Sequence, residues 1–164
     1  MTDAGVGTAT KLDVMCEDGT VQVSTGGTEM GQGLYTKVAQ AVASKLPLKV
    51  SDVIVTDSET SRVPNSAMTG GSASSECCVA SALNACDTLL DNLAPYLKDN
   101  TVPWTDAVAA ANAAGVNMSV TEFMQKPALP APQMFNYYVY CAGVCEVELD
   151  VLTGETEIRR VDIA

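Results

Sequence analysis

Residues 21–42 read VQVSTGGTEMGQGLYTKVAQAV, and this stretch decides the fold of the surrounding chain. Val21 and Val23 alternate with polar residues, which is typical of a strand with one buried face. From Leu34 onward, apolar residues recur every fourth position, which is typical of an amphipathic helix. Residues 24–33 lie between these two patterns and are rich in glycine. The stretch therefore predicts a strand, a glycine-rich loop and a helix, in that order.

The residues before this stretch predict a second strand. Leu12, Val14 and Cys16 alternate with polar neighbours. Asp18-Gly19 has the composition of a tight hairpin turn. We expect a β-hairpin whose second strand leads directly into the glycine-rich loop.

The residues after the first helix add a strand and a longer helix. Pro47 ends the first helix, and the apolar residues 53–55 predict a short strand. A polar loop over residues 58–72 follows. The strongest helical pattern in the chain comes next, with a start expected at a capping Ser72 or Ser74. Its apolar residues step by three and four positions: Val79, Leu83, Cys86, Leu90, Leu93 and Leu97.

The following segment contains shorter elements. Residues 104–114 are rich in alanine and predict a short helix, and Val120 with Phe123 indicates a further strand. Residues 126–132 contain three prolines and predict an extended, exposed connector.

The C-terminal segment predicts a second hairpin. Residues 137–150 form one long β-pattern, and a Thr153-Gly154 turn joins it to a strand at residues 155–161. Together, these elements predict an α+β (mixed α/β) fold, in which β-hairpins and a mixed sheet pack against two to three helices.

Composition and charge exclude several classes of protein. The chain has 164 residues, of which 47% are hydrophobic and 18% charged, as in one compact domain. Its formal charge of −11 repels phosphate backbones and anionic lipid headgroups, so we expect neither nucleic acid nor a membrane as partner. The sequence shows no bilayer-spanning stretch and no secretory signal in residues 1–10, which predicts a cytoplasmic location.

The chain contains six cysteines and no histidine. Because no C-x-x-C pair occurs, we expect free, mostly buried thiols and no zinc or iron–sulfur site. Adjacent Cys77 and Cys78 favour core packing over a redox pair, and Cys141 and Cys145 are also expected in the core. Without histidine, the chain lacks the usual base for a serine or cysteine nucleophile, which argues against a self-contained hydrolase.

The glycine-rich loop supports two interpretations. Gly26, Gly27, Gly31 and Gly33 lie where a strand leads into a helix, so exposed backbone N–H groups could bind an anionic group. The alternative is a tight turn whose glycines adopt positive φ. The spacing matches neither the G-x-G-x-x-G dinucleotide motif nor a P-loop. Gln32 adds a side-chain amide that can donate and accept.

Three segments resemble one known family. Residues 26–37 (GGTEMGQGLYTK) resemble a cofactor loop of the xanthine dehydrogenase and aldehyde oxidase family. Residues 58–76 resemble the next cofactor-contacting segment of its molybdopterin-binding domain, and residues 145–155 resemble the strand and hairpin beyond. We therefore expect residues 11–164 to be part of this domain, and residues 1–10 to lie outside the match.

The resemblance implies that both loops bind molybdenum–molybdopterin through its pyranopterin and phosphate. The residues it implies are Gly31, Gln32 and Gly33 from the first loop and Thr69, Gly70, Gly71, Ser72 and Ser74 from the second. Hydroxyls at a helix start suit a phosphate, although an ordinary serine-rich helix cap remains the alternative for the second loop. Tyr35 stands where many relatives carry histidine, which leaves the contact at that position open.

The resemblance also implies a reaction, in which oxygen from water enters a C–H bond of a purine, N-heterocycle or aldehyde while molybdenum accepts two electrons. The family's general base lies in a Gly-Val-Gly-Glu type motif that is not in this sequence, so neither Glu29 nor Glu76 is assigned that role. FAD and 2Fe–2S clusters are expected only in other domains. The implied partners are the remaining domains or subunits and a small-molecule substrate, and the full enzyme could be a homodimer.

Two other features have alternative interpretations. Arg62 could bind a phosphate or a substrate carboxylate, but a solvated loop charge is favoured. Tyr137, Tyr138 and Tyr140 could stack on a ligand, but packing is favoured because aromatic residues are common in strands.

Two functional hypotheses follow from the sequence. In the first, the chain is part of an enzyme, binds molybdopterin only together with other loops, and is inactive alone. In the second, it is a structural or interaction module derived from the same family. Molybdenum and pterin analysis would separate them.

Overall fold

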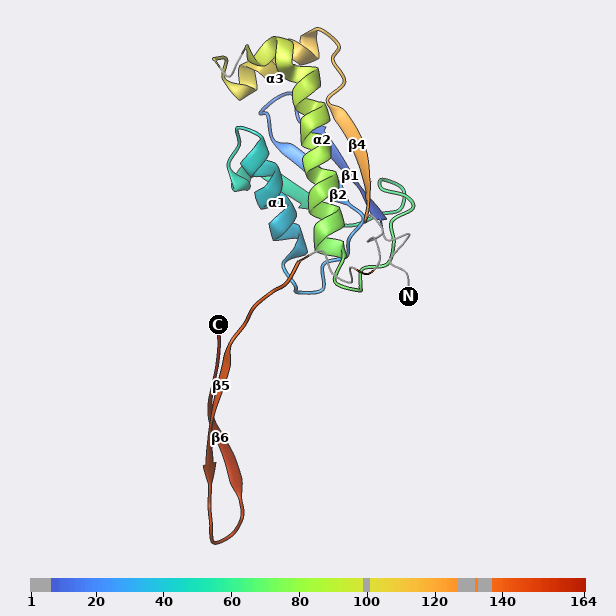
Figure 1. The fold of residues 1–164 in the computed structure, drawn as a ribbon. Coiled ribbons are helices and arrows are strands. Elements are labelled where there is room, and N and C mark those ends of the chain that lie inside the picture. The colour runs from blue at the N-terminus through green and yellow to red at the C-terminus, as the bar shows by residue number, and fades with distance from the viewer. Residues whose placement is uncertain (1–6, 99–100, 127–131, 133–136) are drawn as a thin grey trace. The chain divides into compact units, whose positions relative to one another are not determined.

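The computed structural model describes residues 7–98, 101–126, 132 and 137–164 (Figure 1). The chain divides into two compact units, Met1–Ala128 and Leu129–Ala164. The first unit contains a four-stranded sheet and the helices, and the second contains a two-stranded sheet. This arrangement confirms the expected α+β fold.

The sheet of the first unit is mixed. It contains β1 (Gly7–Val14), β2 (Val21–Thr25), β3 (Val53–Thr56) and β4 (Ser119–Gln125), in the order β3-β2-β1-β4. β1 pairs antiparallel with both β2 and β4, whereas β2 and β3 are parallel. Because β2 and β3 run in the same direction, the loops that follow them leave the sheet at the same edge.

The predicted hairpin between β1 and β2 is confirmed. Its turn is held by Asp18, whose carboxylate accepts hydrogen bonds from the backbone N–H of Thr20 at 2.9 Å and from its hydroxyl at 2.7 Å. Gly19 has a φ of 76°, a conformation that favours glycine. The carbonyl of Gly19 accepts a 2.8 Å hydrogen bond from the indole N–H of buried Trp104, which ties the turn to the third helix.

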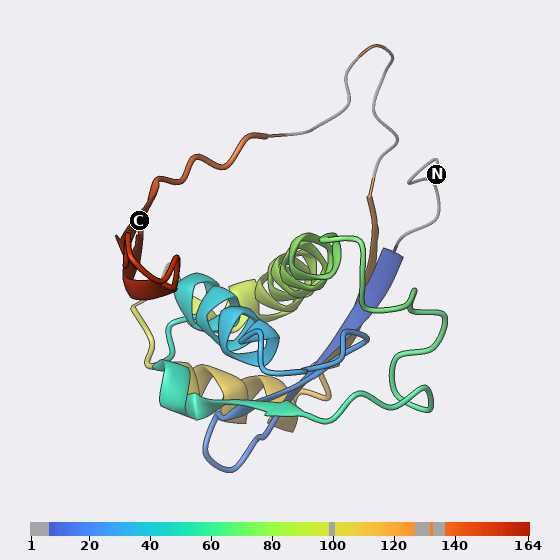
Figure 2. The ribbon, with the colours of Figure 1, turned by 90° about the horizontal axis from the view of Figure 1, so that it is seen from below.

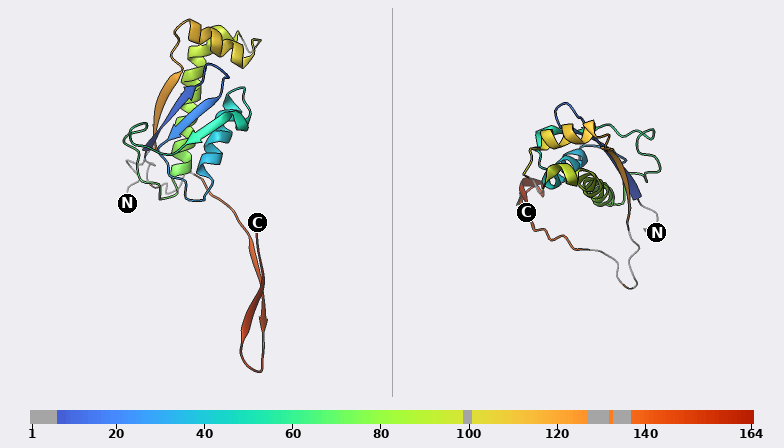
Figure 3. Two further views of the ribbon diagram at one scale, coloured as in Figure 1. Left: turned by 180° about the vertical axis from the view of Figure 1, so that it is seen from behind. Right: turned by 90° about the horizontal axis from the view of Figure 1, so that it is seen from above.

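Two helices cover one face of the sheet. α1 (Leu34–Lys45) and α2 (Ser74–Leu97) lie side by side, and the strands lie in front of them when the molecule is seen from behind (Figures 2 and 3). α3 (Trp104–Ala113) packs against α2, and the short 3-10 helix η1 (Val50–Asp52) precedes β3. All three predicted helices are therefore present. Within the described residues, none of them combines the length and apolar composition of a bilayer span.

The buried face of α2 differs from the predicted one. Val79, Leu83 and Leu90 are only half-buried, although Cys86, Leu93 and Leu97 are buried as expected. The fully buried face also contains small residues: Cys78, Ser81, Ala82 and Ala85, together with Leu89. The pattern of large apolar residues predicted the wrong buried face, because the residues that contact the sheet have small side chains. These small side chains allow the helix to lie close to β1 and β4.

The predicted cap of α2 is wrong. The N-cap residue is Ala73, which makes no side-chain capping hydrogen bond, and Ser74 is the first helical residue. Ser72 has a φ of 56°, whereas an N-cap residue adopts the β region. The turn that precedes the helix therefore displaces the serine from the capping position.

The second unit is a β-hairpin of β5 (Gly143–Leu149) and β6 (Thr156–Ile163), which confirms the predicted second hairpin. The register shifts between Glu146 and Val147. The prediction of one strand over residues 137–150 is wrong, because β5 starts only at Gly143. Its partner ends at Ile163, so the β-prone residues before Gly143 have no strand to pair with in this hairpin.

The structure joins none of the six cysteines in a disulfide, and only half of them are buried. Cys77, Cys78 and Cys86 lie in the core, and burial raises the pKa of the Cys86 thiol to about 12. Cys141 and Cys145 are exposed, so their expected core position is wrong. Tyr137, Tyr138 and Tyr140 are exposed in their own unit, and their packing role stays a prediction. Most of the predicted connector at residues 126–132 lies outside the described residues.

The orientation of α2 gives a test with neighbouring residues. Leu89→Ala should lower the free energy of unfolding by about 2–5 kcal/mol, because it empties a fully buried position. Leu90→Ala should cost clearly less, since Leu90 is only half-buried. Urea unfolding of the two variants measures the difference, and an equal or reversed order would contradict this orientation.

Candidate functional site

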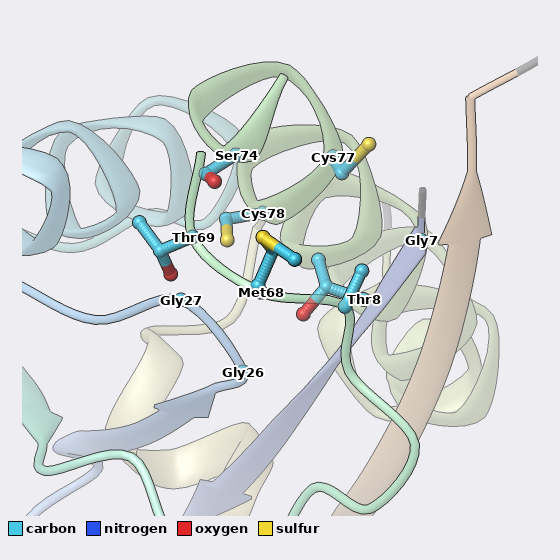
Figure 4. A pocket seen from close by; sticks show the side chains of 10 residues that line it. Gly7, Thr8, Gly26, Gly27, Met68, Thr69, Ser74, Cys77 and Cys78 are labelled. Carbon is cyan, nitrogen blue, oxygen red and sulfur yellow. The ribbon is translucent and has the colours of Figure 1, made fainter. Parts of the chain in front are cut away.

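The two loops predicted to bind a cofactor lie in contact. The backbone N–H of Thr28 in the glycine-rich loop donates a 2.8 Å hydrogen bond to the hydroxyl of Thr69 in the second loop. Figure 4 shows Met68 and Thr69 beside Gly26 and Gly27, with the start of α2 next to them. The two loops lie in contact because one follows β2 and the other follows β3, and these strands are parallel neighbours in the sheet.

Gly26 and Gly27 permit this contact because neither has room for a side chain. A Cβ atom on Gly26 would overlap the side chain of Ser66. A Cβ atom on Gly27 would lie 2.5 Å from Leu34 Cδ2 and 2.7 Å from Cys78 Sγ. Neither glycine has positive φ, so both serve close packing, and the tight-turn interpretation does not apply to them.

The start of α1 is occupied by a carboxylate of the chain itself. Glu29 Oε1 accepts hydrogen bonds from the N–H groups of Gly31 at 2.7 Å and Gly33 at 3.0 Å, and Oε2 accepts one from Tyr35 at 3.0 Å. Backbone hydrogen bonds, that of Tyr35 foremost, hold the pKa of the Glu29 carboxyl below its ordinary value. The amides of Gly31 and Gly33 that could bind an external anion are therefore already bound to Glu29.

Gln32 is exposed, and hydrogen bonds to its own loop fix the orientation of its side chain. Its Oε1 accepts a 2.6 Å hydrogen bond from the N–H of Met30, and its Nε2 donates a 2.8 Å hydrogen bond to the carbonyl of Thr28. The side-chain amide is thus held in one orientation at the surface of the loop. Nε2 carries a second proton, which can be donated to a ligand.

Four other glycines face open space. A Cβ atom on Gly31, Gly33 or Gly71 would meet nothing within 4 Å, and all three have positive φ. For these residues, backbone conformation is sufficient to explain the glycine. Gly70 differs, because it has no positive φ and its Cβ would meet only Met68 Sδ at 4.0 Å. Among the residues that the structure describes, none requires a glycine at position 70.

The second loop presents hydroxyl groups beside an uncapped helix. Thr69 and Ser74 line the small cleft in Figure 4, and Ser72 is exposed. The N-cap residue of α2, Ala73, makes no side-chain capping hydrogen bond, and Glu76 places an acidic side chain in the first turn. Lys37 Nζ donates a 3.4 Å hydrogen bond to Ser75 Oγ, which places a positive charge beside this helix start. The donor set is therefore suited to an anionic group.

The cleft itself is too small for an organic cofactor. Its enclosed volume is about 10 Å³, enough for one water molecule. Of the eight predicted residues, only Thr69 and Ser74 line it. The other six lie elsewhere on the same two loops. A larger ligand would have to lie against the outer surface of the loops.

Sequence reasoning missed the two residues that organise the first loop. Thr28 joins the loops, and Glu29 caps α1 from outside the usual S-x-x-E spacing, so no motif identified it. Arg62 forms a 3.5 Å ion pair with Glu59 and lies 3.5 Å from the hydroxyls of Ser24 and Thr56.

Comparison with known proteins identifies the family. A family model described as a molybdopterin cofactor-binding domain matches residues 3–164. The chain belongs to the molybdopterin cofactor-binding domain family. This match confirms the resemblance found in the three sequence segments.

The relatives of this domain are much longer proteins. Xanthine dehydrogenase 1 of Arabidopsis thaliana is 40% identical over 153 residues, an alignment that covers 89% of this chain and 11% of that protein. Indole-3-acetaldehyde oxidase of Zea mays is 36% identical over 166 residues, which covers 93% of this chain and 12% of that protein. The chain therefore spans 11–12% of the length of these relatives.

Solved structures share the fold of the domain. Quinoline 2-oxidoreductase from Pseudomonas putida 86 has a TM-score of 0.68 at 17% identity, over 94% of this chain and 22% of that chain. Aldehyde oxidoreductase from Desulfovibrio desulfuricans ATCC 27774 has a TM-score of 0.64 at 18% identity, over 99% of this chain and 18% of that chain. These likenesses show the fold.

The close approach at Gly26 can be tested by substitution. Gly26→Ala should lower the free energy of unfolding by about 1–3 kcal/mol, because its methyl group overlaps Ser66. Gly70→Ala is the control, since its methyl group meets only Met68 Sδ, at 4.0 Å. Adding Ser66→Gly to Gly26→Ala should restore part of the loss. Urea unfolding measures all three, and equal stability of the two alanine variants would contradict the packing role.

The capping role of Glu29 predicts a pH dependence. Because its pKa is lower in the folded chain, its stabilising contribution is complete above the ordinary value of 4.5 and is lost as pH falls through the folded pKa. Glu29→Gln should therefore unfold at a lower temperature than wild type at about pH 7, and the difference should shrink toward about pH 3. Exposed Glu17→Gln is the control. A Glu29→Gln deficit that is absent at neutral pH, or equal at both pH values, would refute the cap.

Proposed function

We propose that this chain forms one wall of the molybdopterin site of a larger molybdenum hydroxylase of the xanthine dehydrogenase and aldehyde oxidase type. The observation that carries the proposal is the hydrogen bond from Thr28 to Thr69, which joins both predicted cofactor loops into one surface. Two loops that lie 41 positions apart in sequence can then contact the same ligand.

The residues on this surface fit the cofactor. Gly70 leaves its backbone open to close approach without serving the packing of the chain. The hydroxyls of Thr69, Ser72 and Ser74 can donate to a phosphate or pterin oxygen beside the uncapped start of α2. Gln32 presents an oriented amide from the other loop. Of the first-loop residues, Gly31 and Gly33 would contact the cofactor through their open faces, since Glu29 holds their amides.

In this proposal, the residues of the chain bind and orient the cofactor. The bound cofactor supplies a molybdenum centre that accepts two electrons while oxygen from water enters a C–H bond. No residue of this chain is proposed as the general base, and Glu29 is unsuited to it, because backbone hydrogen bonds hold its pKa low and its oxygens are engaged. The base, FAD and 2Fe–2S clusters would be supplied by other parts of the enzyme.

The substrate class is proposed as a purine, N-heterocycle or aldehyde. The names of similar proteins, xanthine dehydrogenase, quinoline 2-oxidoreductase and indole-3-acetaldehyde oxidase, support this range. Partner domains or subunits are proposed, because the chain spans only 11–12% of the length of its relatives. We propose that residues 11–164 form the cofactor-binding part of the enzyme. We also propose that the full enzyme assembles as a homodimer.

Gly70 provides the sharpest test of cofactor contact. Gly70→Val should change the stability of the chain little, because a Cβ atom there meets only Met68 Sδ, at 4.0 Å. The same side chain should collide with the cofactor and cost about 1–3 kcal/mol of binding, which lowers pterin and molybdenum content about fivefold or more. Pterin fluorescence and metal analysis of the purified enzyme with all its subunits measure this loss.

Gly143→Val in β5 is the matched control, since a Cβ atom there meets only Asp162 O at 4.0 Å. Full cofactor content in Gly70→Val would contradict contact at this loop. A wild-type protein that contains neither pterin nor molybdenum under any condition would support the alternative, a non-catalytic module derived from this family.

A further inference from the structure

Tyr35 and Ser58 form a reciprocal pair of hydrogen bonds beside the glycine-rich loop. The N–H of Ser58 donates to Tyr35 Oη at 3.3 Å, and the two side-chain oxygens lie 3.1 Å apart. Ser58 Oγ also lies 2.8 Å from the carbonyl oxygen of Thr25 and bonds to that of Gly27. Both side chains are half-buried. The pair thus connects the start of α1, the end of β2 and the segment after β3.

Hydrogen-bond accounting fixes the direction of this pair. An amide N–H can only donate, so Tyr35 Oη accepts from the backbone of Ser58. If the Tyr35 hydroxyl donates its proton to Ser58 Oγ, the Ser58 proton remains available for the carbonyl of Gly27 or Thr25. The reverse direction would deprive both carbonyls of this donor. The tyrosine hydroxyl therefore directs the serine toward the glycine-rich loop.

Tyr35 holds the glycine-rich loop at two points. Its hydroxyl acts through Ser58 on the carbonyl of Gly27, and its backbone N–H donates to Glu29 at 3.0 Å. Thr28 lies between these two points. Its N–H makes the contact with Thr69, and its carbonyl accepts from Gln32. The orientation of this one residue determines whether the two loops face the same ligand.

We propose that Tyr35 and Ser58 are positioning residues that fix the Thr28 backbone, and with it the relative placement of Gln32 and Thr69. This inference rests on the proposed function, because the placement matters for a cofactor that contacts both loops. Neither residue touches the cofactor in the proposal. Their effect passes through the Gly27 carbonyl and Glu29.

The test compares Tyr35→Phe with wild type in the complete enzyme. Loss of one neutral hydrogen bond should speed amide hydrogen exchange of peptides covering residues 26–33 about fivefold. Pterin content should fall by a similar factor, about fivefold, because the binding surface is no longer fixed. Peptides from α2 should exchange at the wild-type rate, which a general loss of stability would not allow.

Tyr96→Phe is the matched control, because Tyr96 packs against the core from α2 and lies outside both loops. Ser58→Ala should behave like Tyr35→Phe, and Ser58→Thr, which keeps the hydroxyl, should recover most of the wild-type behaviour. The serine variants also carry the test if Tyr35→Phe does not accumulate as folded protein.

The outcomes separate the two proposals. Faster loop exchange with reduced pterin content in Tyr35→Phe and Ser58→Ala, but not in Tyr96→Phe, supports the positioning role. Wild-type exchange, or faster exchange with full pterin content, overturns that role while the proposed function stands. A wild-type enzyme without pterin overturns the proposed function and this inference with it.

Discussion

The missing side chains of Gly26 and Gly27 let the glycine-rich loop lie directly against neighbouring side chains at the edge where β2 and β3 end. Through this approach, the first loop packs against Ser66 on one side and against the core at Leu34 and Cys78 on the other. The parallel pairing of β2 and β3 brings the loops to the same edge, and the glycines then allow them to touch. The starts of α1 and α2 lie at this edge for the same reason.

Charge divides the two loops into different roles. The chain carries a net charge of −11, so its overall field opposes an anionic ligand, and only local donors can favour one. At α1, those donors are bound to Glu29, which stabilises the loop from within. At α2, the N-cap residue makes no side-chain capping hydrogen bond, and Lys37 and several hydroxyls lie beside a first turn that also contains Glu76. The anionic end of a cofactor is therefore better accommodated at the second loop, while the first loop offers a shaped surface with the Gln32 amide.

Residue periodicity was sufficient to predict the elements of the first unit, because buried strands and helices leave repeats that require no knowledge of their neighbours. The family was also readable, since residues 26–37 combine glycine spacing with specific side chains. Features that depend on tertiary contacts could not be predicted from the sequence. The buried face of α2 is set by small residues such as Ala82 and Ala85, which carry little hydrophobic signal. β5 starts where its partner strand ends, and the capping by Glu29 depends on a loop conformation that no motif encodes.

A crystal structure of the complete enzyme with its cofactor tests the central claim most directly, namely that the two joined loops form one cofactor-binding surface. The account predicts that the pterin lies against both loops at once, with its closest backbone approach at Gly70 and a hydrogen bond from Gln32. It also predicts that Thr28 remains bonded to Thr69 and that Glu29 still caps α1. A cofactor bound elsewhere, or a structure in which packed protein covers both loops, would contradict it.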